Sequence, residues 1–228
     1  MGALNAQPTD DGSGHEHCVF QQIAAGLRTQ GWCVVPDALP PLLAAELFEQ
    51  VRTASSGEFL LAGVGRSRDH VHNRFVRRDR IRWIDGRAEA EQQWLAWCGR
   101  LQVYLNRQLF LGLFSFESHF AHYRPGDFYK KHVDAFRSVE PDRDSRRVLS
   151  LLTYLNPGWQ LSDGGELVIY DVEGTASLQK VMPAYGTVVV FLSTEVPHEV
   201  LPAARDRYSI AGWFRVNGSV ADRPDPPR

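Results

Sequence analysis

Residues His119-Phe-Ala-His-Tyr-Arg-Pro-Gly-Asp-Phe-Tyr-Lys-Lys-His-Val-Asp134 form the segment around which the rest of the chain is organised. The segment ends in His132-Val133-Asp134. On an extended strand, residues two positions apart project from the same face, so we expect His132 and Asp134 to point the same way. A second imidazole comes from a distant segment, Pro197-His198-Glu199. These three side chains are therefore candidates for one shared site.

Two imidazoles and one carboxylate together make a familiar set of metal ligands. A 2-His-1-carboxylate set covers one face of a metal ion and leaves other positions open, which is typical of non-heme Fe(II) oxygenases. The H-x-D pattern alone is a weak signal, because a single histidine on a strand is more often structural than a ligand. The prediction that His132, Asp134 and His198 bind a metal therefore depends on other residues of the same pocket.

The strand expected after Asp206 supplies such a residue. Its alternation places Arg207 on the same face as Ser209, Ala211 and Trp213. An arginine among apolar strands is costly unless it meets an anion, and its planar fork suits a carboxylate. Tyr154, on another expected strand, is able to donate its hydroxyl to the same carboxylate. A small dicarboxylic acid bound to both the metal and Arg207 would satisfy every group.

The composition is that of an ordinary globular domain. The chain has 228 residues, of which 43% are hydrophobic and 23% are charged. We expect one domain over residues 15–216, with core strands in 113–216 and flexible tails over 1–14 and 217–228. The net charge of −2 predicts no general attraction to nucleic acid or to anionic membranes. Three widely spaced cysteines and the lack of an apolar leader predict a cytoplasmic protein with reduced thiols.

Helical periodicity comes first along the chain, and strand patterns follow. Helical spacing of apolar residues is found in 18–30, after the pair Pro40-Pro41, and in 89–110. Short strands are expected at 32–35 and 81–84. The later segments are rich in β-branched and aromatic residues, and strands are expected at 116–124, 148–156, 166–171, 186–193, 199–201 and 207–216. This order predicts an α+β fold in which helices buttress one face of a closed or double-sheet β structure.

An irregular, arginine-rich segment spans residues 63–82. It is interpretable as a solvated cationic loop or as a lid over the site. Local positive charge favours a macromolecular partner with an acidic surface, because it steers such a partner during encounter. The segment lacks the interleaved aromatic residues of single-strand binding platforms, so we expect no nucleic-acid partner.

The sequence resembles the prolyl hydroxylases that depend on Fe(II) and 2-oxoglutarate. It is similar in particular to the bacterial members that act on elongation factor Tu and that resemble the hypoxia-inducible-factor prolyl hydroxylases. The resembling stretch runs from about Gly63 to Phe214, and the arginine lies nine positions after the second histidine, as in that family. The motifs, in order, are Arg80-Ile-Arg-Trp-Ile-Asp-Gly86, Tyr123-Arg-Pro-Gly126, Tyr129-x-x-His132-x-Asp134, Tyr154-Leu-Asn156, Gly164-Gly165, Pro197-His198-Glu-Val200 and Arg207-Tyr208.

This resemblance implies a double-stranded β-helix (jelly-roll) core with N-terminal buttressing helices. It also implies that the metal ligands His132, Asp134 and His198 hold iron. Arg207 and Tyr154 would donate hydrogen bonds to the distal carboxylate of 2-oxoglutarate. The residues implied to bind 2-oxoglutarate are Arg207, Tyr154, Tyr123, Leu167 and Val200.

The same resemblance implies a substrate region beside the iron. Tyr129 and Trp213 would sit where the substrate enters, and Arg147 would contact it. Arg77 and Asp79 would form an ion pair that anchors the lid. The role of His119 is left open.

The implied reaction uses O2 and 2-oxoglutarate to hydroxylate a prolyl residue of a protein, with release of succinate and CO2 and with ascorbate as reductant. Elongation factor Tu is the implied partner. The same residues would also serve an oxygenase acting on a free amino acid or small molecule, or a non-catalytic cupin-like module that binds a metal and a carboxylate. A zinc hydrolase fits less well, because no general-base carboxylate stands at the H-E-x-x-H spacing.

Overall fold

The computed structural model of the protein describes residues 13–62, 75–135 and 146–217. Residues 1–12 and 218–228 of the predicted tails, and residues 63–74 of the predicted lid, lie outside the described residues. The described residues form three α-helices, α1 (Ser13–Gln30), α2 (Pro41–Thr53) and α3 (Glu89–Leu109), and two short 3-10 helices, η1 (Ser56–Glu58) and η3 (Leu161–Asp163). The strands are β1 (Trp32–Val35), β2 (Leu60–Leu61), β3 (Arg80–Trp83), β4 (Leu113–Tyr123), β5 (Tyr129–His132), β6 (Arg147–Tyr154), β7 (Leu167–Tyr170), β8 (Ser177–Val181), β9 (Val188–Leu192), β10 (His198–Val200) and β11 (Arg207–Val216).

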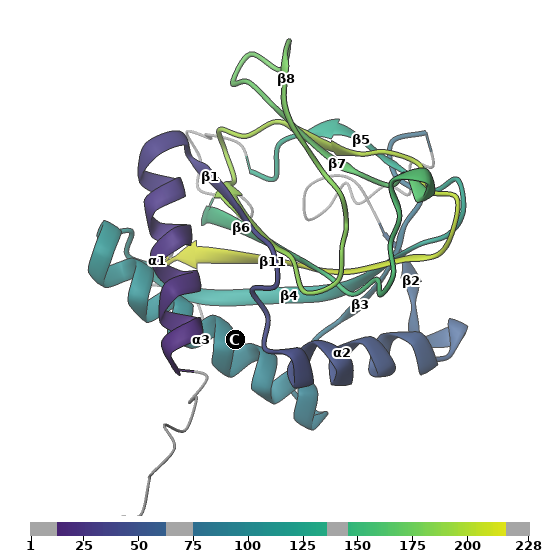
Figure 1. Cartoon of the computed structure of the whole chain (residues 1–228), viewed down its shortest axis with the longest axis horizontal. Coiled ribbons are helices and arrows are strands. Elements are labelled where there is room, and N and C mark those ends of the chain that lie inside the picture. Colours follow the sequence, from purple (N-terminus) through teal and green to yellow (C-terminus); the bar gives the residue numbers. More distant parts are fainter. Residues whose placement is uncertain (1–12, 63–74, 136–145, 218–228) are drawn as a thin grey trace, which may run out of the picture.

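The strands form two antiparallel sheets that together make a double-stranded β-helix, so the predicted α+β fold class is confirmed. The larger sheet has the order β1-β9-β6-β11-β4-β3-β2, and the smaller one has the order β5-β10-β7-β8. Figure 1 shows the helices on one side of the larger sheet and the smaller sheet on the other. The larger sheet is therefore the middle layer of the molecule.

Alternation along the strands of this middle layer builds two cores. On β4, Phe116 and Phe120 join the cluster that packs against the helices, whereas Ala121 and Tyr123 join the cluster between the sheets. Burial of each such large apolar side chain contributes roughly 1.5–3 kcal/mol. The side chains that point between the sheets are the ones able to form a site.

Local chemistry explains where the helices begin and end. Pro41 opens α2, where its missing N–H would have had no helical partner. Helix α3 closes at Phe110, which is left-handed with φ 54° and donates its N–H to the Asn106 carbonyl over 3.1 Å. Helix α1 begins at Ser13, earlier than the predicted Cys18, and its first turns are held by an ion pair of 2.7 Å between Glu16 and Arg100 of α3.

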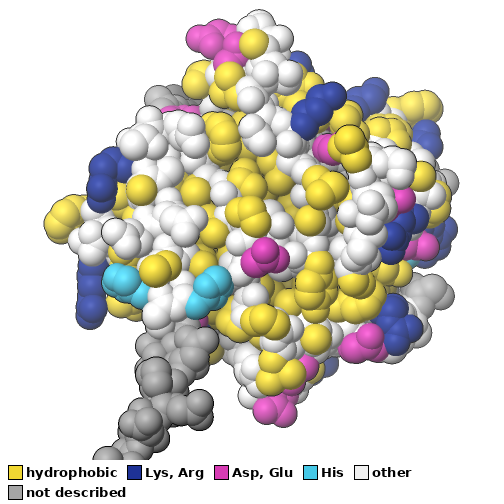
Figure 2. Space-filling model, in the orientation of Figure 1, with side chains coloured by type: hydrophobic (Ala, Val, Ile, Leu, Met, Phe, Trp, Pro, Cys, Tyr) yellow, Lys and Arg dark blue, Asp and Glu magenta, His cyan; other side chains and the backbone are white. Residues whose placement is uncertain are grey.

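Two strands were not predicted. Strand β8 reads SLQKV and is exposed at all but its last residue, so it lacks the alternation of a half-buried strand. Strand β2 has only two residues and pairs with β3. Among the described residues, no helix combines the length and the apolar character needed to cross a membrane. The face in Figure 2 mixes hydrophobic side chains with charged side chains of both signs, in keeping with the net charge of −2.

Candidate metal centre

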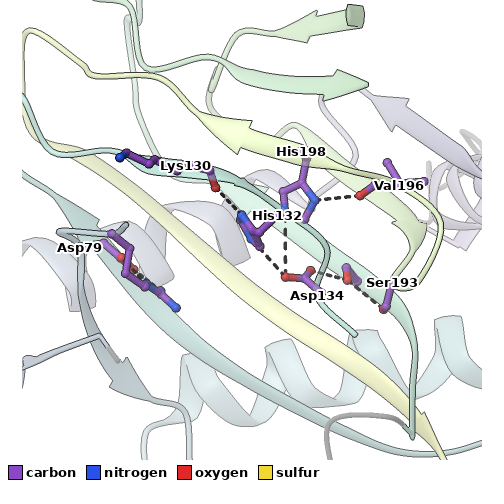
Figure 3. Close-up of polar contacts among 9 residues, drawn as sticks. Asp79, Lys130, His132, Asp134, Ser193, Val196 and His198 are labelled. Atoms are coloured by element: carbon purple, nitrogen blue, oxygen red, sulfur yellow. Dashed lines mark hydrogen bonds and ion pairs between the residues drawn. The ribbon is translucent and has the colours of Figure 1, made fainter. Parts of the chain in front are cut away.

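The three predicted metal ligands converge between the two sheets. His132 ends β5 and His198 begins β10, and the two residues are direct partners in the antiparallel ladder. Asp134 Oδ1 lies 3.5 Å from His132 Nε2 and 3.8 Å from His198 Nε2. One ligand atom from each of the three residues lies within 4.8 Å of the others. Figure 3 shows these side chains pointing toward one another.

The route by which Asp134 reaches this point differs from the prediction. Strand β5 ends at His132, and Asp134 lies in a bend just beyond it, so the expectation of a single strand carrying both residues is wrong. The bend is fixed because the N–H groups of Asp134 and Ala135 both donate to the Ser193 carbonyl, each over 3.1 Å. Tertiary hydrogen bonding, and not strand alternation, therefore turns the carboxylate toward the imidazoles.

Each imidazole is held by its other nitrogen. His132 Nδ1 lies 2.7 Å from the Lys130 carbonyl oxygen, and His198 Nδ1 lies 3.0 Å from that of Val196. A carbonyl only accepts, so each Nδ1 carries a proton and donates it. The lone pair of each Nε2 is left facing Asp134, which is the usual orientation of metal-binding histidines.

The protonation states also suit a metal. Burial would raise the pKa of the Asp134 carboxyl, but His198, His132 and the Ser150 hydroxyl hold that pKa well below its usual range. Burial lowers the pKa of His198 to about 4. Near neutral pH the carboxylate is ionised and His198 is neutral, as metal binding requires. The donor set therefore fits a divalent metal with open coordination positions.

Ser150 on β6 is a supporting residue that sequence reasoning missed. Its Oγ donates to Asp134 Oδ2 over 2.5 Å and lies 2.9 Å from Ser193 Oγ. We predict that Ser150→Ala lowers the affinity for a divalent metal by roughly 10–100-fold, because the carboxylate loses the group that orients it. Equilibrium dialysis with Mn(II) measures this. Ser177→Ala, on the exposed strand β8, is the control, and equal affinities in the two variants would contradict the prediction.

Arg207 and Tyr154, the residues predicted to bind an anion, are both buried, and the Arg207 guanidinium lies 5.0 Å from the centroid of the Tyr154 ring. Arg207 is fully buried, and its Nε donates to the Gly165 carbonyl over 2.9 Å. Its Nη1 lies 3.3 Å from Ser209 Oγ. Its Nη2 and the Tyr154 hydroxyl are buried and have no hydrogen-bond partner among the described residues. An unpaired buried donor costs about 1–3 kcal/mol, so these two groups fit a ligand carboxylate.

The side chains predicted to line this site are apolar or aromatic, and they pack together. Tyr123, Leu167 and Val200 belong to the cluster between the sheets that also contains Tyr154, so the predicted lining residues are brought together. Burial raises the pKa of Tyr154 to about 12, and its phenol therefore stays a donor. Gly165 has φ +70°, and a Cβ there would lie 3.2 Å from Arg207 Cδ and 2.8 Å from Ala203 Cβ. Only glycine allows this approach.

On the other side of the metal ligands, Tyr129 stacks on the ring of His132 with a centroid distance of 3.5 Å. The Arg77 guanidinium lies over the Tyr129 ring at 4.3 Å. Arg77 and Asp79 form the ion pair expected of them, with Nη2 and Oδ2 2.5 Å apart, and Asp79 is buried. The role of this pair in anchoring a lid stays a prediction.

Arg147 and Trp213 also lie together, in an arrangement that includes an unpredicted residue. The Arg147 guanidinium lies 3.8 Å from the centroid of the Trp213 ring. Its Nη2 donates to Glu117 Oε1 over 2.9 Å, and Glu117 is 8% exposed. Glu117 lies opposite Trp213 in the β4–β11 ladder, and Trp213 lies opposite Ser150 in the β11–β6 ladder. This cross-strand row connects Glu117 to the metal ligands.

His119 is buried between Trp83 and Trp213, and the ring centroids lie 5.3 Å and 5.4 Å from that of His119. Burial, reinforced by the Arg77 guanidinium, lowers the pKa of His119 from 6.5 to about 4. As the pH falls from about 6.5 to 4, the unfolded chain takes up this proton before the folded chain does. The free energy of unfolding must therefore fall through that window.

We predict that His119→Asn removes part of this pH dependence. From pH 7 to pH 5, the wild type should lose about 2 kcal/mol more unfolding free energy than the variant. Urea denaturation at the two pH values measures the difference. His198 titrates in the same direction in both proteins and therefore cancels. Equal losses in the two proteins would show that His119 is not held neutral by the fold.

Comparisons with known proteins agree with this geometry. Residues 118–215 match the family model of the 2OG-Fe(II) oxygenase superfamily. The crystal structure of a Pseudomonas putida prolyl-4-hydroxylase is 42% identical, with a TM-score of 0.76, over 87% of this chain and 100% of that one. A Trichoplax adhaerens prolyl hydroxylase in complex with a hypoxia-inducible-factor peptide is 27% identical, with a TM-score of 0.75, over 92% and 94% of the two chains. Human prolyl hydroxylase EGLN3 is 27% identical over 87% of this chain and 84% of its own.

Proposed function

Because the chain belongs to the prolyl hydroxylase family of the 2OG-Fe(II) oxygenases, we propose that it hydroxylates a prolyl residue of elongation factor Tu. Fe(II) and 2-oxoglutarate are the cofactors that this family implies. The observation that carries the proposal is the pairing of two features between the sheets. One is the set His132, Asp134 and His198, and the other is the pair of unpartnered buried donors on Arg207 and Tyr154.

In this proposal His132, Asp134 and His198 hold the metal, and the pocket of Arg207 holds 2-oxoglutarate. When bound, Fe(II) and 2-oxoglutarate supply the activation of O2, which is coupled to decarboxylation of 2-oxoglutarate to succinate and CO2. The protein supplies geometry and excludes water. Arg207 Nη2 and the Tyr154 hydroxyl orient the distal carboxylate, while Tyr123, Leu167 and Val200 shield the carbon chain between the two ends.

The substrate side of the proposal uses Tyr129 of β5 and Trp213 of β11. Tyr129 is stacked against the proposed ligand His132, so a prolyl ring next to Tyr129 would lie close to the metal. Arg77 and Arg147 each already hold a carboxylate of the protein. A substrate does not have to bring an anion to these arginines, which favours a prolyl residue inside a polypeptide over a free amino acid. The peptide complex of the Trichoplax relative supports the same choice.

The choice of elongation factor Tu is supported by the ordered motifs from Arg80 to Tyr208, which resemble those of the bacterial enzymes that act on it. Incubation of elongation factor Tu with the protein, Fe(II), ascorbate and 2-oxoglutarate tests it. The expected result is a single prolyl peptide whose mass rises by about 16 Da, the addition of one oxygen, with stoichiometric succinate. Omission of 2-oxoglutarate is the control. Hydroxylation of free proline, with elongation factor Tu left unmodified, would instead establish a small-molecule oxygenase.

A further inference from the structure

Two consecutive glycines, Gly164 and Gly165, lie between η3 and β7 and contact Arg207. The Gly165 carbonyl accepts from Arg207 Nε over 2.9 Å, and Arg207 is fully buried. Both glycines have positive φ angles, of 66° and 70°, which glycine adopts without steric cost. The lack of a side chain also gives a glycine pair many alternative backbone conformations. The carbonyl that holds Arg207 therefore has to be fixed by contacts with other segments.

The indole of Trp159 provides one of these contacts. Its Nε1 donates to the Gly164 carbonyl over 3.0 Å, and the side chain is 6% exposed. At the other end of the same peptide unit, the Gly165 N–H donates to the Pro202 carbonyl over 3.0 Å. Because both its C=O and its N–H are bonded, this planar peptide cannot rotate without breaking a hydrogen bond. The direction of the next carbonyl, that of Gly165, depends on the plane that is fixed in this way.

The ring of Trp159 also packs against the second glycine. A Cβ on Gly165 would lie 3.4 Å from Trp159 Cζ2 and 2.8 Å from Ala203 Cβ. The backbone of Gly165 is therefore packed closely against both side chains. Trp159 thus contacts the loop in two ways, through its N–H and through its ring, and only the first fixes the direction of a carbonyl.

The three guanidinium nitrogens of Arg207 have different surroundings. Nε is held by the Gly165 carbonyl and Nη1 lies 3.3 Å from Ser209 Oγ, whereas Nη2 is buried without a hydrogen-bond partner in the described part of the chain. Because the guanidinium is planar and rigid, the position of Nε decides where Nη2 points. The Tyr154 hydroxyl is also buried and unpartnered there, so a carboxylate is held by both donors only when Nη2 is correctly aimed. Movement of the Gly165 carbonyl would therefore weaken the predicted anion site.

We propose that Trp159 is a positioning residue for this anion site, and that its indole N–H fixes the Gly164–Gly165 peptide and, through it, the Gly165 carbonyl that orients Arg207. This inference rests on the proposed function, since it assigns Arg207 to the distal carboxylate of 2-oxoglutarate. It deepens that function by adding a residue of the segment between β6 and β7, which acts on the ligand only through Arg207.

The test removes the indole N–H and measures binding of 2-oxoglutarate to the Mn(II)-loaded protein by calorimetry, without turnover. Trp159→Phe should raise the Kd for 2-oxoglutarate by about three- to tenfold, the loss expected for one neutral hydrogen bond. Pyruvate has the same 2-oxo acid end but no distal carboxylate. Its Kd, measured by ligand-observed NMR, should therefore stay unchanged, as should the Kd for Mn(II). Replacement of Trp159 by benzothienylalanine keeps the bicyclic ring and lacks only the N–H, so it should give the same result even if Trp159→Phe fails to fold.

A double-mutant cycle shows whether Trp159 acts through Arg207. In the Arg207→Gln protein, Trp159→Phe should cause no further loss of affinity for 2-oxoglutarate, because the carbonyl no longer orients a guanidinium. Trp97→Phe is the matched control, since Trp97 of α3 is also buried but its Nε1 has no hydrogen-bond partner among the residues described. It should lower the free energy of unfolding and leave the Kd values for 2-oxoglutarate and pyruvate unchanged.

The outcomes distinguish this inference from the proposed function. An unchanged Kd for 2-oxoglutarate in both Trp159 variants overturns the inference, and the proposed function stands if Arg207→Gln still raises that Kd. Equal rises for 2-oxoglutarate and pyruvate, or additive losses in the double mutant, also overturn it, because they indicate a general disturbance of the fold. If the Kd for 2-oxoglutarate alone rises while elongation factor Tu stays unmodified, the inference stands and the choice of elongation factor Tu is wrong.

Discussion

Asp134→Ala should abolish metal binding and, with it, all turnover of 2-oxoglutarate. The carboxylate supplies the anionic ligand of the set, and its Oδ1 lies within 4 Å of both imidazole Nε2 atoms. Loss of groups that merely orient a ligand usually costs 10–100-fold in affinity, so loss of the ligand itself should cost more than about 100-fold. Equilibrium dialysis with Mn(II) and succinate release with Fe(II) are the two measurements.

If Asp134 is a metal ligand, the affinity for Mn(II) and the rate of succinate release must fall together. Asp85→Ala removes a half-exposed carboxylate that pairs with Arg87 before α3, and both readouts should then stay at their wild-type values. Asp134→Glu keeps the charge but moves it outward by one methylene, and it should bind metal more weakly than the wild type. An Asp134→Ala protein that retains metal and releases succinate at the wild-type rate would remove Asp134 from the set.

Arg207→Gln should raise the Kd for 2-oxoglutarate by about 100-fold or more. Hydrogen bonds to a charged group are worth roughly 1.5–3 kcal/mol each, and the guanidinium is expected to offer a carboxylate more than one. The glutamine side chain keeps a polar group in a fully buried position without the fork or the charge. Titration of 2-oxoglutarate into the Mn(II)-loaded protein measures the loss independently of catalysis.

Graded variants of the same pocket make this result specific. Arg207→Lys keeps the charge but not the planar fork, so its Kd should lie between those of the wild type and Arg207→Gln. Tyr154→Phe removes one unpartnered donor and should raise the Kd by about tenfold. Arg205→Gln, on a half-exposed residue two positions earlier, is the control. Equal affinities of Arg207→Gln and Arg205→Gln would contradict an anion site at Arg207.

Features with a local physical cause were predictable from the sequence. Apolar periodicity placed α3 within one residue of its bounds, and strand alternation placed Arg207 and Trp213 on the face that turns inward. The sequence also predicted that His132, Asp134 and His198 come together, because few residue types bind metals and their order along the chain is distinctive. The family resemblance then supplied the jelly-roll topology, which periodicity alone leaves open.

The remaining features depend on contacts between distant segments. The bend at Asp134 is set by the Ser193 carbonyl, and strand β8 is visible only through its pairing with β7. Glu117 and Ser150 acquire their roles from the register of β4, β11 and β6, which no single stretch of sequence encodes. For Glu117 and Ser150, the available signal was strand alternation, which places each polar side chain on the inner face next to a predicted site residue.

The place of β11 in the larger sheet has a consequence for biosynthesis. It is the last strand of the described residues, yet it lies between β4 and β6, which precede it in the chain. A nascent polypeptide that emerges from the ribosome up to Asp206 therefore carries two open strand edges, which are templates for mispairing. Arg207 is the first residue of the strand that seals this gap. Completion of the predicted anion site and protection of these edges should therefore occur in the same late step of folding.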